Sequence, residues 1–103
     1  MHNKITRDLF LAFVRVHILH HAAEEPIFGL EMIGELRRHG YTLSPGTLYP
    51  ILHALEKAAC LRSRKEVVNG KLRKYYVVTG RGRRALAEAR TKIRELVDEV
   101  LEE

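Results

Sequence analysis

The amino-acid sequence predicts a mainly α-helical domain with one small β-hairpin, in which a winged helix-turn-helix is followed by a C-terminal dimerisation helix. Three observations lead to this fold class. Two helical segments are joined by a short connection that contains Gly40, which is the outline of a helix-turn-helix. Two strand-like runs then flank Asn69-Gly70, a dipeptide that favours the two-residue turn of a hairpin. Apolar residues near the C-terminus recur close to a heptad repeat. We therefore assign residues 1–80 to the winged-helix part and residues 81–103 to the last helix, within one compact domain.

The composition is that of an ordinary globular protein, with 30% charged and 46% hydrophobic residues. Cys60 is the single cysteine, so an internal disulfide is excluded and a reducing cytoplasm is the expected location. No stretch has the length of a membrane span, and the N-terminus does not have the form of a signal peptide. We expect a cytoplasmic protein with no membrane partner.

The first helix is expected from about residue 4 to residue 23. Its apolar side chains, among them Leu9 and Phe13, cover most of the circumference instead of forming one stripe. A helix of this kind must be buried on more than one side. In so small a domain, the second burying surface indicates another subunit.

Three histidines, His17, His20 and His21, lie near the end of this helix at spacings that place imidazoles on neighbouring positions. Two histidines on one helical turn still need a third ligand, and the sequence shows no obvious one. We favour a polar helix end and assign no metal site and no cofactor. A metal-responsive winged-helix sensor that uses these three histidines is the alternative function.

The second and third helices are expected at residues 28–39 and 44–60. Gly40 suits the left-handed position after a helix, Ser44 can cap the next helix, and Pro45 fits its first position. In the third helix, an apolar stripe can face the core, and Pro50 falls early, in the second turn. The opposite face carries small, hydroxyl-bearing or hydrogen-bonding residues, and we assign it to DNA binding: Ser44, Gly46, Thr47, Tyr49, Pro50 and His53.

The hairpin is expected from strands 61–68 and 71–78. If the turn sets the register, Glu66 faces Arg73 and Arg64 faces Tyr75, and the Glu66–Arg73 pair helps to hold that register. One face is then apolar and is expected to cover the helices, through Leu61, Val67, Leu72, Tyr76 and Val78. The other face is basic and carries Arg62, Arg64, Lys71 and Arg73, with Lys65 and Lys74 near the edges.

Positive charge is concentrated in one block. Residues 61–84 contain nine Lys or Arg and one Glu, although the net charge of the whole chain is only +5. A solvated basic face is the simpler reading of such a run. Beside a helix-turn-helix, however, the block is the electrostatic footprint expected of a double-stranded DNA surface. The third helix would enter the major groove, and Arg64, Lys71, Arg73 and Lys74 would contact phosphates.

Thr79 can cap the last helix, whose apolar stripe could pack back on the first helix of the same chain. We favour a homodimer, because both helices have an apolar face to spare. The expected interface residues are Leu9, Phe13, Leu86, Ile93, Val97 and Val100.

The chain resembles PadR-type transcriptional regulators over nearly its whole length. The run from Leu43 to Pro50 is similar to the family's reader helix, and Tyr75 to Thr79 followed by Gly82 is similar to the end of its wing. The resemblance is weaker near Ala59, where the family often has glycine. It implies a homodimeric repressor of the branch with a single C-terminal helix, which binds a palindromic operator and is released by a ligand. In some small members that effector binds at the dimer interface; this chain has no tryptophan to stack a flat ligand there.

Two other classes of protein fit the sequence less well. An enzyme is not expected, because no paired carboxylates, activated nucleophile or phosphate-binding loop is present. A winged helix that binds only proteins would have no need for the basic block.

Overall fold

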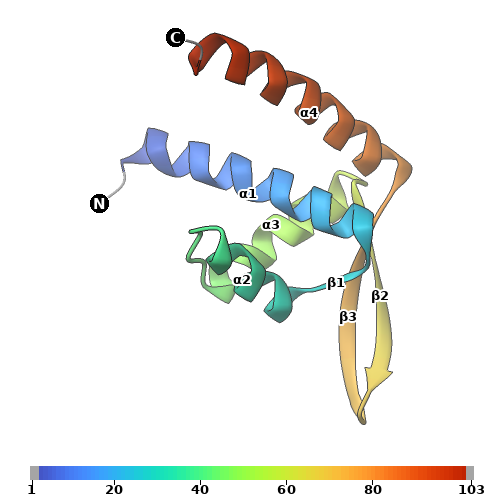
Figure 1. Ribbon diagram of the computed structural model, residues 1–103. Coiled ribbons are helices and arrows are strands. Elements are labelled where there is room, and N and C mark those ends of the chain that lie inside the picture. The colour runs from blue at the N-terminus through green and yellow to red at the C-terminus, as the bar shows by residue number, and fades with distance from the viewer. Residues whose placement is uncertain (1–2, 102–103) are drawn as a thin grey trace.

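The computed structural model describes residues 3–101, and this part of the chain forms a helical body, a projecting hairpin and a projecting last helix (Figure 1). In chain order the elements are α1 (Lys4–Glu24), β1 (Ile27–Phe28), α2 (Gly29–Arg38), α3 (Pro45–Lys57), β2 (Leu61–Val68), β3 (Lys71–Val78) and α4 (Gly80–Val100). The predicted fold class is confirmed. Among the described residues, no helix is both long and apolar enough to cross a membrane.

The core lies where α1, α2 and α3 meet the base of the hairpin. It uses the C-terminal half of α1, one face of α2 and the inner stripe of α3, which carry apolar residues at helical spacing. Its buried members are Val14, Ile18, Leu19, Ala22, Ile27, Met32, Leu36, Leu48, Ile51, Leu52, Leu61, Tyr76 and Leu86.

The connection between α2 and α3 is a tight turn around Gly40. Gly40 has a φ of +91°, which is open to glycine and strained for other residues, and this confirms its predicted role. The Tyr41 N–H donates to the carbonyl of Leu36 at 2.9 Å and so closes the end of α2. Ser44 stands at the N-cap of α3, but the expected side-chain cap is wrong. Its backbone carbonyl accepts the N–H groups of Thr47 and Leu48, both at 3.0 Å, and its hydroxyl makes no capping bond.

The hairpin has the predicted strands and register. Glu66 pairs with Arg73 and Arg64 with Tyr75 across the ladder, and Asn69 and Gly70 both have positive φ, as a two-residue turn requires. A third strand was not predicted: β1 pairs with β3, so that the sheet order is β1-β3-β2. Phe28 is the last residue of β1, so α2 begins at Gly29 and not at residue 28 as predicted.

Only the base of the hairpin covers the helices. Leu61 and Tyr76 are buried, whereas Val67 is 72% exposed and Leu72 is 65% exposed. The expectation that all five apolar residues of this face would cover the helices is therefore wrong for the outer pair. Their part of the hairpin extends beyond the helical body as a free wing (Figure 1).

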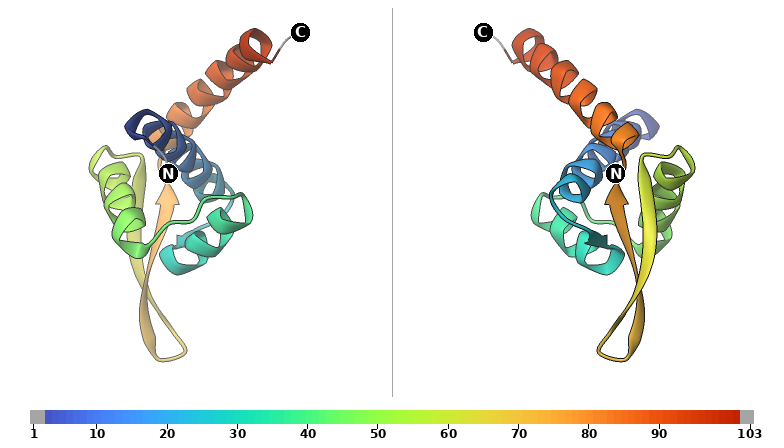
Figure 2. Two further views of the ribbon diagram at one scale, coloured as in Figure 1. Left: turned by 90° about the vertical axis from the view of Figure 1, so that its left-hand side faces the viewer. Right: turned by 90° about the vertical axis from the view of Figure 1, so that its right-hand side faces the viewer.

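The last helix starts against the core and ends away from it. Thr79 caps it as predicted, since its Oγ1 accepts the N–H of Gly82 at 3.0 Å. Gly82 is buried, but every described residue from Thr91 to Leu101 is exposed. Figure 2 shows this C-terminal half extending away from the other helices in both views.

Candidate nucleic-acid interface

The outer face of α3 holds most of the residues that the sequence assigned to base reading. Gly46, Pro50 and His53 are exposed, and Thr47 is half-buried. Pro50 does not break the helix, because the N–H it lacks would have bonded only to Gly46 in the first turn. Gly46, Thr47, Pro50 and His53 carry no negative charge, so this face can approach base edges without repulsion from the phosphates.

Tyr49 packs inward, against the start of α2. A Cβ atom added to Gly29 would lie 2.6 Å from the Tyr49 hydroxyl and 2.8 Å from its ring carbons. The ring therefore occupies the space that a side chain at position 29 would need. Tyr49 therefore sets the spacing between α2 and α3, and its DNA-binding role stays a prediction.

The charges of the wing are divided between its two faces. Side chains alternate along a strand, and Lys65 pairs directly with Lys74, so these two lysines share the face that is turned toward α3. They are not at the edges, as the sequence suggested. The opposite face carries the remaining basic residues, Arg62, Arg64, Lys71 and Arg73.

Two arginines of the second face have partners within the sheet. The Arg73 guanidinium lies 4.7 Å from the centre of the Phe28 ring on β1, and Arg64 Nε is 2.7 Å from a carboxylate oxygen of Glu66. The predicted Glu66–Arg73 ion pair is therefore wrong, although the two residues are directly opposite in register. Arg73 is held in place by a ring that sequence reasoning had assigned to a helix.

Glu56 joins α3 to the wing, a role that the sequence analysis missed. Its Oε2 accepts the hydroxyl of Ser63 at 2.6 Å and the Ser63 N–H at 3.2 Å, while Lys74 Nζ lies 3.8 Å from Oε1. The hydrogen bond from the Ser63 hydroxyl, followed by the charge of Lys74, holds the pKa of Glu56 below its ordinary value. This carboxylate links the outer surface of α3 to β2 and β3. The only signal for it in the sequence is its place near the end of the predicted third helix, shortly before the first strand of the wing.

The comparisons with known proteins agree with this geometry. Residues 18–88 match the sequence model of the transcriptional regulator PadR-like family. The chain belongs to the PadR-like family. It is also 50% identical over 95 residues to the transcriptional regulator Rv3488 of Mycobacterium tuberculosis, an alignment that covers 92% of this chain and 89% of that protein.

Two solved structures of PadR proteins have the same fold. A PadR family regulator from Eggerthella lenta is 30% identical, with a TM-score of 0.76 over 93% of this chain and 88% of the other. A PadR-like regulator from Bacillus cereus is 25% identical, with a TM-score of 0.80 over 93% and 98%. This PadR-like protein is thus a DNA-binding transcriptional regulator with a winged helix-turn-helix fold, and not an enzyme.

Most of the residues predicted to join two subunits are exposed in the single chain. Leu9 is 53% exposed, and Phe13, Ile93, Val97 and Val100 are also exposed. The prediction for Leu86 is wrong, because this side chain is only 3% exposed and belongs to the core of its own chain. The heptad-like stripe of α4 therefore serves two surfaces: its first turns pack inside the chain, and its last turns remain uncovered.

Proposed function

We propose that this PadR-like regulator is a homodimeric repressor that binds a palindromic operator in the cytoplasm. The observation that carries the proposal is that the wing lies beside α3: the outer face of α3 carries no acidic residue among its proposed reading residues, and the wing carries basic residues on both of its faces. In this arrangement α3 enters the major groove, and Arg64, Lys71, Arg73 and Lys74 contact phosphates. Lys74 would contact a phosphate from the wing face that is turned toward α3, where its Nζ lies 3.8 Å from Glu56 Oε1.

The proposed dimer uses the dimerisation helix assigned to residues 81–103, of which 102 and 103 lie outside the described residues, together with the N-terminal half of α1. Four apolar side chains of α4 (Ile93, Leu96, Val97 and Val100) are exposed although their spacing forms one stripe. Leu9 and Phe13 of α1 are exposed as well. A contiguous apolar surface of this kind is typical of a protein–protein contact, and a two-fold dimer would bury both helices at once.

We also propose that an apolar small molecule acts as the effector, by binding between α1 and α4 of the two subunits. The exposed apolar side chains of both helices support this location. Release from DNA would follow if the ligand favours a dimer whose two α3 helices do not match the spacing of the half-sites.

The experiment that tests the proposal is selection of DNA from random oligonucleotides with the purified protein. We expect an inverted repeat whose half-sites are centred about one helical turn, roughly 34–36 Å, apart or a multiple of this. A single asymmetric site would contradict the palindromic operator. The absence of any enriched sequence would contradict specific binding.

Substitutions on α3 test which residues read bases. Thr47→Ala and His53→Ala should each cost about 1–3 kcal/mol on the selected operator and much less on random DNA, because base contacts are lost only where the correct base is present. Lys57→Ala is the comparison on the same helix. Lys57 is exposed, and removal of its positive charge should weaken binding to operator and to random DNA alike. Operator and random-DNA affinities are measured at one salt concentration. Equal losses for Thr47→Ala on both DNAs would mean that α3 only positions the protein.

Substitutions on the wing test its phosphate contacts. Lys71→Ala or Arg73→Ala should weaken binding to all sequences and flatten the log–log salt dependence by about one unit each, because one fewer counterion is released. Lys4→Ala removes the same charge from the exposed start of α1, where Lys4 pairs with Asp8, and should leave the slope unchanged. The slopes are measured by titrating salt at fixed protein concentration. Unchanged slopes in the wing variants would show that the basic face contacts something other than DNA.

A further inference from the structure

A second group of side chains lies away from the DNA-binding surface, where α1 passes the end of α2. His17 and His21 of α1 meet His39, the residue that follows α2, and one ring nitrogen from each lies within 4.8 Å of the other two. The His17 ring is 4.7 Å from the His39 ring and 6.3 Å from that of His21, measured between centroids. The sequence alone did not indicate a third ligand, and the structure supplies one: His39, which lies 18 positions after His21 in the chain.

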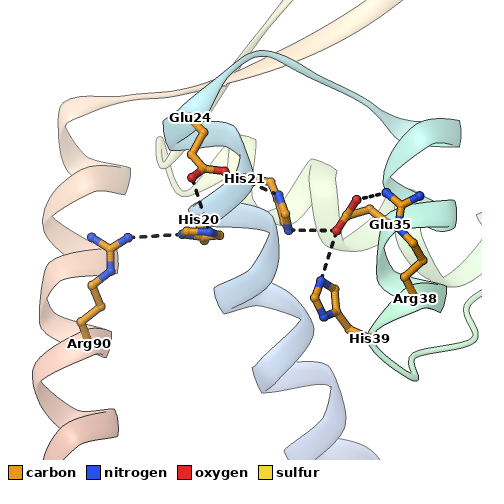
Figure 3. A network of polar contacts seen from close by, with 7 residues as sticks. All are labelled: His20, His21, Glu24, Glu35, Arg38, His39 and Arg90. Atoms are coloured by element: carbon orange, nitrogen blue, oxygen red, sulfur yellow. Dashed lines mark hydrogen bonds and ion pairs between the residues drawn. The ribbon is translucent and has the colours of Figure 1, made fainter.

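His20, in contrast, does not belong to this group. Figure 3 shows His20 directed toward Arg90 of α4, whereas His21 and His39 both point toward the carboxylate of Glu35. Arg90 is 3.3 Å from Nδ1 of His20, and Glu24 lies 3.7 Å from its Nε2. No metal site was assigned from the sequence, where His17, His20 and His21 stood only as an alternative; the structure brings together His17, His21 and His39 instead.

We propose that His17, His21 and His39 bind one divalent transition-metal ion, which joins α1 to the end of α2. Imidazole nitrogens suit ions such as Zn²⁺, Ni²⁺ and Cu²⁺. In tetrahedral geometry, zinc–nitrogen bonds of about 2.0–2.1 Å place two such nitrogens roughly 3.3–3.4 Å apart. Rotation of the exposed His39 ring toward the half-buried rings of His17 and His21 closes the site.

Glu35 gives the site the carboxylate that histidine ligands usually require. Its Oε2 is 3.1 Å from Nε2 of His39 and 3.8 Å from Nε2 of His21. A carboxylate in this position fixes the orientation of the two rings and raises their basicity, or completes the coordination itself. Arg38 bonds to the other oxygen of Glu35 and restrains the carboxylate.

The surroundings of the site favour the approach of a cation. A cavity of about 470 Å³ opens beside it between α1 and α2, and its walls include His21 and Glu35. Three further glutamates line the same cavity: Glu24, Glu25 and Glu31. Acidic walls of this kind raise the local concentration of positive ions.

The test is calorimetric titration of the full, untagged chain with Zn²⁺. We expect one saturable site per chain and a higher Tm when the ion is present, since it binds the folded state. His39→Ala and His17→Gln should each weaken binding at least ten-fold, because loss of a direct ligand should cost no less than the roughly 10–100-fold typical of a lost supporting contact. Glu35→Gln should weaken it less than either.

Two control variants and one spectroscopic measurement decide the location of the site. His20→Ala and Cys60→Ser should bind Zn²⁺ like the wild type, and circular dichroism should show that all variants fold. Co²⁺ in place of Zn²⁺ should give visible absorption bands in the wild type and lose them in His39→Ala. The proposal is overturned if the wild type shows no saturable binding, if His39→Ala and His17→Gln both bind normally, or if His20→Ala alone loses the ion.

A regulatory role for this ion rests on the proposed function, and it is tested separately. His39 directly precedes the turn that leads into α3, so an ion held there restrains the reader helix. Operator affinity should change at least about five-fold on addition of Zn²⁺, a coupling of ordinary allosteric size, and His39→Ala should remove the change. Metal binding is measured without DNA, so failure of the site is distinguishable from failure of operator binding. An unchanged operator affinity would overturn the regulatory role.

Discussion

Replacing Ile93 and Val97 with aspartate should convert the proposed dimer into a folded monomer. Both side chains lie on the apolar stripe of α4 and are exposed in the single chain, so the core does not depend on them. In a dimer they would be buried, and two unpaired carboxylates in an apolar contact are costly enough to prevent association. Light scattering at micromolar concentration gives the mass, and circular dichroism shows whether the helices remain.

The control places one carboxylate on the other side of the same helix. Thr91 is exposed and lies opposite the apolar stripe, so Thr91→Asp should remain a dimer. Operator affinity should follow the assembly. The monomeric variant should lose about 100-fold or more, because two half-sites can no longer be bound together. A dimer that survives both substitutions at Ile93 and Val97, or a wild-type monomer, would show that α4 has another partner.

The parts of the fold that local chemistry determines could be predicted closely. Asn69-Gly70 determines the turn, the turn determines the register, and Gly40 marks the end of α2. β1 could not be found in this way, because two residues, Ile27 and Phe28, are too few to show the alternation of a strand. Its pairing with β3 is a tertiary contact that no local pattern reports.

The surface that a side chain faces could be predicted less well from the sequence than the turns and the register. Leu86 and Ile93 belong to one stripe, and its spacing does not say where the core ends and the proposed interface begins. The metal-ligand candidates show the same limit, since His39 is brought to His17 and His21 only by the packing of α2 on α1. Glu56 is a further case: its contact with Ser63 depends on how the wing folds back on α3.

The start of α4 contains a glycine that leaves no room for a side chain. Gly82 lies in the first turn of α4, where the helix crosses the turn that ends α3. A Cβ atom at this position would be 2.2 Å from the carbonyl oxygen of Cys60 and 2.7 Å from Val78 Cγ2. The nearest of these atoms is backbone, and it is held in place because the Thr79 N–H donates to the same Cys60 carbonyl at 3.1 Å. No side-chain rotation can relieve the overlap.

Gly82→Ala should therefore destabilise the protein strongly, although alanine is a better helix former than glycine. Relief requires α4 to move away from the wing, and we expect a loss of about 3 kcal/mol in the free energy of unfolding, at the upper end of ordinary overpacking. Gly80→Ala is the matched control in the same turn: its Cβ would meet only Arg84 Nη1, at 3.5 Å, which is an ordinary contact. That variant should stay within about 0.5 kcal/mol of the wild type, as surface substitutions usually do. Urea unfolding at one protein concentration measures both. Equal stability of the two variants would mean that the start of α4 can shift freely, and that the close approach of α4 to the wing is not required for the fold.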